Sequence, residues 1–251
     1  MKHIFALALT WCAATVAAAQ TTTSELWKVS SGFGYTQGSY GLNTDTKVWF
    51  VPFGVGYNST DWAFDASSSY LTIKGPAAAV NGIEIIRPTP KAESGAGDTV
   101  LSGSWKLLHD PGQLQVSLTG KVKLPTADYN RGLGTGATDY TAQLDLLERF
   151  GSITPFGSVG YRWLGSHGVY HLKDGMFADA GAALRLEEGT SIGAFYEWDD
   201  KISNGAADAS QVTAFFYDKI APQWAVNLYA LSGFTEASPD WGGGVSLIFT
   251  F

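Results

Sequence analysis

Histidine is the first side chain to consider for metal binding or catalysis, and the chain contains four. His167 and His171, with Asp174 close by, carry enough donor atoms to suggest a metal site. Histidines four residues apart share one face only on a helix, however, and residues 165–175 are predicted to form a loop. We therefore expect neither a metal nor another cofactor.

A barrel that hydrolyses lipid would need a serine paired with a histidine, and a third group to orient that histidine. His109 is predicted to lie in a short turn, at the end opposite the loop that holds His167 and His171. Glycine-rich patterns occur within or beside predicted strands rather than between a strand and a helix, which argues against a phosphate-binding loop. We predict no catalytic residues and expect that the chain is not an enzyme.

Charged residues recur opposite apolar faces in segments with a period of two, the period of a β-strand. If the apolar faces contact lipid, the charged faces point into the interior of a closed sheet and would line a pore. Twelve residues are expected there: Lys28, Asp65, Lys106, Lys121, Lys123, Asp139, Asp145, Arg149, Arg162, Asp179, Arg185 and Glu197.

Two compatible roles are open for these charges. Buried charges are usually paired, so they can form ion pairs that brace the wall between neighbouring strands. The expected pairs are Lys121 or Lys123 with Asp145, Arg162 with Asp179, and Arg185 with Glu197. Alternatively, the charges select solutes, as rings of charged side chains do in other channels.

Twelve alternating segments are needed to position these residues, and no segment has a helical period of comparable quality. The last one is the clearest, because Val245, Leu247, Phe249 and Phe251 alternate with small or polar residues, apart from Ile248. The twelve predicted strands cover about 26–35, 47–57, 61–74, 101–107, 114–124, 139–146, 153–163, 178–186, 191–198, 211–217, 223–232 and 241–251.

The connections alternate in length. Tight turns are predicted at 58–60, 109–112, 150–152, 187–190 and 219–223. Longer loops are predicted at 37–46, 75–98, 125–138, 165–175, 199–209 and 233–240. Short turns on one side and long loops on the other are typical of an outer-membrane barrel, with the turns in the periplasm. An even strand number then leaves both termini in the periplasm.

The predicted fold is an all-β, transmembrane, antiparallel up-and-down β-barrel of 12 strands. The alternative is a soluble β-sandwich, which would need its apolar faces turned inward. The longest loop, 75–98, contains the apolar segment Pro76–Pro90. We hypothesise that this segment folds inward as a plug, so that deletion of residues 78–92 raises conductance.

Export is predicted from the N-terminus. A basic start, the apolar run Ile4–Ala18 and an Ala-x-Ala site indicate a signal peptide over 1–19, which leaves 20–251 as the barrel. Cys12 is not expected to be lipidated, because Trp11 precedes it. A net charge of −7 argues against a nucleic-acid partner, and 14% aromatic residues suit aromatic girdles. We expect a location in the outer membrane of a Gram-negative bacterium, surrounded by its lipid and inserted by the barrel assembly machinery through the strand ending at Phe251.

Glycine-rich motifs in the middle of the chain carry a narrower resemblance. They are Gly95-Ala-Gly-Asp98, Lys123-Leu-Pro-Thr126 followed by Asp128, Leu133-Gly-Thr-Gly136 followed by Asp139-Tyr140, and Val159-Gly-Tyr-Arg162. Their order over about 95–165 resembles the outer-membrane transporter family named for the meta-pathway of phenol degradation. The alternative is that these motifs only shape the ends of strands, since Pro stops a strand and Gly permits a sharp turn.

The resemblance implies a porin-like channel for passive uptake of small hydrophobic or aromatic solutes. A non-conducting structural or surface-binding barrel is the first alternative, and a barrel lipid hydrolase is the second. Solute flux separates the channel from the non-conducting barrel, and replacement of serines by alanine tests the hydrolase.

Overall fold

The computed structural model describes residues 26–80, 83–86, 92–109, 114–168, 172–203 and 206–251, and for 77–86 the backbone alone. The predicted signal peptide lies outside the described residues. Twelve strands form one closed sheet: β1 (Leu26–Gly38), β2 (Thr46–Asn58), β3 (Trp62–Lys74), β7 (Thr99–His109), β8 (Gln115–Leu124), β9 (Asp139–Leu147), β10 (Ile153–Trp163), β11 (Gly175–Glu187), β12 (Thr190–Asp199), β13 (Ala209–Ala221), β14 (Trp224–Gly233) and β15 (Trp241–Thr250).

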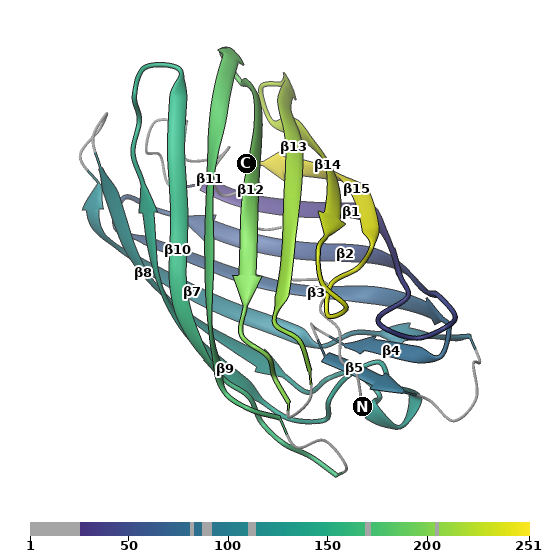
Figure 1. Ribbon diagram of the computed structural model, residues 1–251. Helices are drawn as coiled ribbons and strands as arrows, with labels where there is room; N and C mark the ends of the chain where they lie inside the picture. Colours follow the sequence, from purple (N-terminus) through teal and green to yellow (C-terminus); the bar gives the residue numbers. More distant parts are fainter. Residues whose placement is uncertain (1–25, 81–82, 87–91, 110–113, 169–171, 204–205) are drawn as a thin grey trace.

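Every strand of the barrel pairs antiparallel with its neighbours in chain order, and β1 pairs with β15 (Figure 1). At this seam Trp27 and Phe251 exchange two backbone hydrogen bonds, of 3.0 and 2.9 Å. The first and last described residues of the barrel therefore lie at the same end. All twelve predicted strands are confirmed.

The outer surface is apolar, as the alternation predicts. Side chains such as Phe33, Phe53 and Phe64 are about half exposed, although they are large and hydrophobic. A continuous exterior of this kind is typical of a barrel in contact with lipid. The β-sandwich alternative is wrong, because the sheet closes on itself and its apolar faces point outward. No helix among the described residues is long and apolar enough to cross a membrane.

Within the described ranges, three short strands and one short helix lie outside the ring of twelve. β4 (Ala77–Val80) and β5 (Ile83–Ile86) form a separate two-stranded sheet, and η1 (Tyr129–Arg131) is a 3₁₀ turn in the loop after β8. The inward folding of the segment Pro76–Pro90 stays a prediction, because its side chains from 77 onward lie outside the described residues.

β6 (Glu93–Ala96) extends β7 along β3, with one irregularity between them. Tyr70 of β3 faces Ala96, whereas Ser67 faces Val100, so the β6–β7 side contains one extra residue. Such a β-bulge changes the direction in which the side chains beside it point. Here it brings Asp98 into the interior, where its side chain is fully buried.

Candidate functional site

The barrel interior has two unlike sides. Inward side chains of β3 and β7–β11 are mostly polar and partly exposed; among them are Ser67, Ser102, Lys121, Asp145, Ser158 and Asp179. We call this side the polar wall. Inward side chains of β13–β15 are buried, including Thr213 and Asn227 at 1% exposure each. Space that water can reach therefore lies along the polar wall.

Two of the lysines predicted to lie in the interior are held by polar partners near the short-turn end. Lys28 Nζ lies 3.0 Å from Asp65 Oδ1, and their side chains meet over Gly56, which has no side chain to separate them. Lys106 Nζ donates to Asn58 Oδ1 at 2.7 Å and to the Ser59 carbonyl at 2.6 Å. These contacts brace β1, β3 and β7 across the turn after β2.

An acidic row crosses β9, β11 and β12. Ser158 faces both Asp145 and Asp179 across strands and donates a hydrogen bond to Asp179. Asp145 accepts hydrogen bonds from Thr119 and Gln143, both 2.5 Å long. Glu197 faces Asp179 and accepts from Gln211 at 2.9 Å. The carboxylates are therefore satisfied mainly by neutral donors.

Cations lie beside this acidic row. Arg162 forms an ion pair with Asp199, 2.7 Å between Nη2 and Oδ1, and its guanidinium lies 4.5 Å from the centre of the Phe177 ring. Lys121 forms no ion pair with any described residue and stays partly exposed. Lys121 is therefore the cation of the polar wall that is best placed to meet a solute.

The predicted ion pairs are wrong. The structure pairs Arg162 with Asp199 instead of Asp179, and Lys123 with Asp98 and Asp139 instead of Asp145. Glu197 bonds Gln211 rather than Arg185. Arg185 donates to the Gly151 carbonyl at 3.0 Å at the short-turn end, near Arg149, which follows β9. The register explains the difference: Lys123 lies directly opposite Asp139, whereas Arg162 lies opposite Gly175 rather than Asp179 and reaches across β11 to Asp199.

A buried charge cluster joins three of the four family-like motifs. Lys123 Nζ lies 2.7 Å from Asp139 Oδ2 and 3.3 Å from Asp98 Oδ2, and it donates to Thr135 Oγ1 at 2.6 Å. Burial raises the pKa of the Asp98 carboxyl, which lies between β6 and β7, while the Lys123 ammonium and the Ala127 N–H lower it. Buried charges of this kind are tolerated because each has several partners.

The charge cluster, defined by Asp98, Lys123, Thr135 and Asp139, holds the loop 125–138 against the inner wall. Asp98 Oδ1 accepts the Ala127 N–H at 3.0 Å, and Asp139 Oδ1 accepts the Gly165 N–H at 2.9 Å. Leu133 from this loop is 1% exposed and packs with inward apolar residues of the barrel. This loop therefore narrows the interior at the long-loop end.

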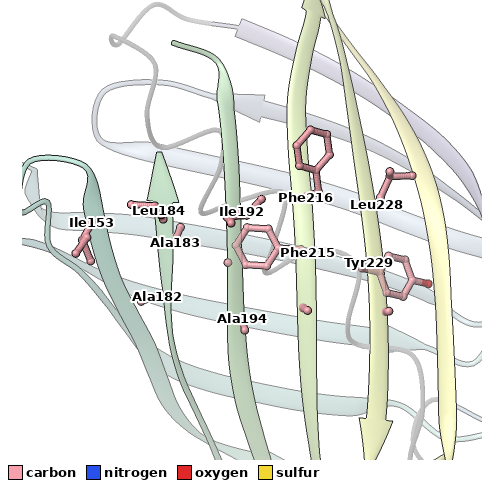
Figure 2. Close-up of a pocket in the computed structure, with 13 residues that line it drawn as sticks. Ile153, Ala182, Ala183, Leu184, Ile192, Ala194, Phe215, Phe216, Leu228 and Tyr229 are labelled. Atoms are coloured by element: carbon pink, nitrogen blue, oxygen red, sulfur yellow. The ribbon is translucent and has the colours of Figure 1, made fainter. Parts of the chain in front are cut away.

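Aromatic side chains line the buried side of the barrel interior. One cross-strand row runs Gly193, Phe215, Tyr229, Gly244, Gly34, Phe50, Leu71 and Gly95. Each ring in this row lies over a facing glycine, and Figure 2 shows Phe215 and Tyr229 leaning along the wall. Phe156 and Phe195 join them, with ring centres 5.9 Å apart from each other and 6.4 and 6.3 Å from Phe215. We call Phe50, Phe156, Phe195, Phe215 and Tyr229 the aromatic belt.

Replacement of Gly34 by alanine tests how tightly the aromatic belt is packed. A Cβ at Gly34 would lie 2.1 Å from the Phe50 ring, so the ring must tilt toward the barrel axis. Overpacking of this kind costs about 1–3 kcal/mol. We expect Gly34→Ala to lower the free energy of unfolding by that amount in urea titrations in detergent. The control is Gly120→Ala, because a Cβ there meets nothing within 4 Å; equal losses in both variants would contradict the packing described here.

The outer face beside the aromatic belt carries an open apolar hollow of about 830 Å³. A row of small residues, Ala182, Ala194, Ala214 and Ala230, forms its floor, and Leu184, Ile192, Phe216 and Leu228 form a ridge alongside (Figure 2). Strand pairing of β13 continues on both sides there, so the hollow is on the outer surface and is not an opening in the wall.

In the part of the chain that the structure describes, the histidines do not form a metal site with other side chains. His167 packs edge-on against Tyr129, with ring centres 4.8 Å apart. No group of three or more His, Cys, Asp and Glu suited to a metal ion occurs among the described residues. His171 lies outside them, so the pair of His167 with His171 is untested.

Comparison with known proteins supports the fold. No protein-family model matches the chain, and no curated protein matches it in sequence. An outer membrane channel from Pseudomonas putida F1 is 12% identical, with a TM-score of 0.70, over 92% of this chain and 97% of its own. The NanC porin is 9% identical, with a TM-score of 0.60, over 88% and 98%. The transport unit of the autotransporter AIDA-I from Escherichia coli is 11% identical, with a TM-score of 0.51, over 98% and 93%. At these identities the likeness concerns the fold: a closed antiparallel barrel of this type.

Proposed function

We propose that this chain is a bacterial outer-membrane channel for passive uptake of small hydrophobic or aromatic solutes, with its short turns and both termini in the periplasm. The observation that carries the proposal is the divided interior, in which a partly exposed polar wall faces a belt of aromatic rings. Water and polar parts of a solute would follow the polar wall, while apolar parts would contact the rings. The twelve charged residues expected in the interior divide between wall-bracing contacts and this path.

Two further observations support the proposal. The apolar outer surface suits a lipid environment. Three of the four motifs that resemble the transporter family named for phenol degradation meet in the charge cluster, which holds the loop 125–138 where it narrows the interior. A non-conducting barrel is the second candidate, favoured by the buried aromatic belt and the docked loop 125–138. We propose for this chain both membership of that family and the solute class that the resemblance implies.

Single-channel recording of the refolded barrel in a planar bilayer tests the proposal. We expect small, steady openings. A folded barrel that never conducts, and that takes up no aromatic solute into vesicles, would contradict the channel and support the non-conducting barrel.

Lys121→Gln is expected to shift ion selectivity. It removes a positive charge that no described residue pairs with, beside the acidic row Asp145, Asp179 and Glu197. The reversal potential in a salt gradient should therefore move toward cation selectivity, with the conductance little changed. Lys219→Gln, at an exposed lysine near the short-turn end, is the control. An identical reversal potential in Lys121→Gln and the unmodified barrel would remove Lys121 from the path.

A further inference from the structure

Two lysines face each other directly on the outside of the barrel. Lys47 of β2 and Lys74 of β3 are cross-strand partners at the long-loop end. Side chains in this position have Cβ atoms about 5 Å apart, and like charges there repel. Both lysines face outward in the alternation of their strands. Neither forms an ion pair with any described residue. The pair therefore presents concentrated positive charge at the surface.

An aromatic floor lies directly below the lysine pair. An open hollow of about 720 Å³ is lined by both lysines together with Phe33, Tyr35, Trp49 and Asp45. The Tyr35 ring lies 5.3 Å from the Trp49 ring and 5.1 Å from the Trp241 ring, centre to centre. Aromatic side chains at this height mark the boundary between the apolar and the polar part of a bilayer. The hollow is thus cationic above and apolar below.

Among the described residues that line the hollow, Asp45 is the one carboxylate, and it has a partner of its own. Tyr35 donates to Gln37 Oε1 at 2.6 Å, and Gln37 Nε2 donates to Asp45 Oδ2 at 2.5 Å. This chain of hydrogen bonds holds Asp45 on the Gln37 side, and Asp45 forms no ion pair with either lysine. Two positive charges against one negative charge leave the hollow with a net attraction for anions.

We propose that Lys47 and Lys74 bind the phosphate group of an outer-leaflet lipid, whose apolar part packs on Phe33, Tyr35 and Trp49. A phosphate oxygen between two ammonium groups removes their repulsion and accepts charge-assisted hydrogen bonds. A lipid, rather than free phosphate, is chosen because the floor of the hollow is aromatic and continuous with the apolar exterior. This inference rests on the proposed function only for the membrane location.

Retention of lipid A by the refolded barrel, measured by native mass spectrometry in detergent, tests the proposal. Lipid A is a phosphorylated glycolipid, and the same lipid with its phosphates removed is the matched probe. We expect Lys47→Gln/Lys74→Gln to weaken retention of lipid A by about tenfold to thirtyfold, with no effect on the dephosphorylated lipid. Lys219→Gln should retain lipid A as the unmodified barrel does. Asp45→Asn should retain it more tightly, which separates local charge from damage to folding.

Three results would overturn the lipid site. They are equal retention of lipid A by the double variant and the unmodified barrel, equal retention of the two lipids, and displacement of lipid A by millimolar inorganic phosphate. Conductance of the same variants keeps the two proposals apart, because the lysine pair lies outside the interior. A barrel that retains lipid A and never conducts keeps the lipid site and loses the channel. A conducting barrel without preference for lipid A loses the lipid site alone.

Discussion

Lys123→Met is expected to lower the free energy of unfolding by about 3–5 kcal/mol, because removing one partner of a buried ion pair leaves an uncompensated buried charge. Lys123 is the one cation in the charge cluster, and Asp98 and Asp139 both depend on it. Methionine keeps the length and the apolar part of the side chain, so the loss reports on charge. Urea unfolding in detergent, followed by tryptophan fluorescence, measures it.

The matched control for this loss is Lys121→Met, two residues earlier on the same face of β8. Lys121 is partly exposed and lacks an ion pair among the described residues, so its replacement should cost less than about 1 kcal/mol. Adding Asp98→Asn and Asp139→Asn to Lys123→Met should recover part of the stability, because the buried charges are then gone. Equal losses in Lys123→Met and Lys121→Met would show that the charge cluster does not hold the loop.

Phe195→Ala/Phe215→Ala is expected to raise single-channel conductance several-fold. Both rings are inward-facing and at most 4% exposed, so they fill space that water cannot enter. Apolar constrictions of this kind exclude water and thereby limit ion flow. Removing the two rings opens the aromatic belt toward the polar wall.

Phe216→Ala is the control, because Phe216 follows Phe215 in β13 but belongs to the outer face. Its conductance should match the unmodified barrel. Loss of two buried rings also destabilises the fold, by about 3–5 kcal/mol for each. Phe215→Leu therefore serves as the milder variant, with a smaller rise in conductance. Unchanged conductance in folded Phe195→Ala/Phe215→Ala would mean that the aromatic belt is not the constriction.

Strands and connections could be predicted because each leaves a local signature. In β8, apolar and polar residues alternate from Gln115 to Leu124, and the structure places the apolar set outside. The aromatic belt could not be found in this way, because Phe156, Phe195 and Phe215 lie on faces that otherwise look small or polar. Their recognisable signal is the glycine opposite each ring, and this signal exists only once the register is known.

The charge cluster could not be predicted from the sequence for a different reason. Three of its residues, Asp98, Lys123 and Thr135, lie within the glycine-rich motifs, and Asp139 follows one of them. The β-bulge between β6 and β7, however, decides that Asp98 points inward. No pattern of residue types in that segment predicts the extra residue. The partner of Arg162 also depends on the register, because Arg162 lies opposite Gly175 rather than Asp179 and its side chain reaches past Phe177 to Asp199.

The seam between β1 and β15 also determines when the barrel can be completed. Trp27 and Phe251 are hydrogen-bonded although nearly the whole chain separates them. Neighbouring strands pair through residues that are close in sequence, but this contact needs both β1 and β15. Contacts so distant in sequence form slowly, and until then β1 and the growing edge stay open to other chains. Joining the two ends and cutting a long loop should therefore leave every strand neighbour in place while changing which seam closes last.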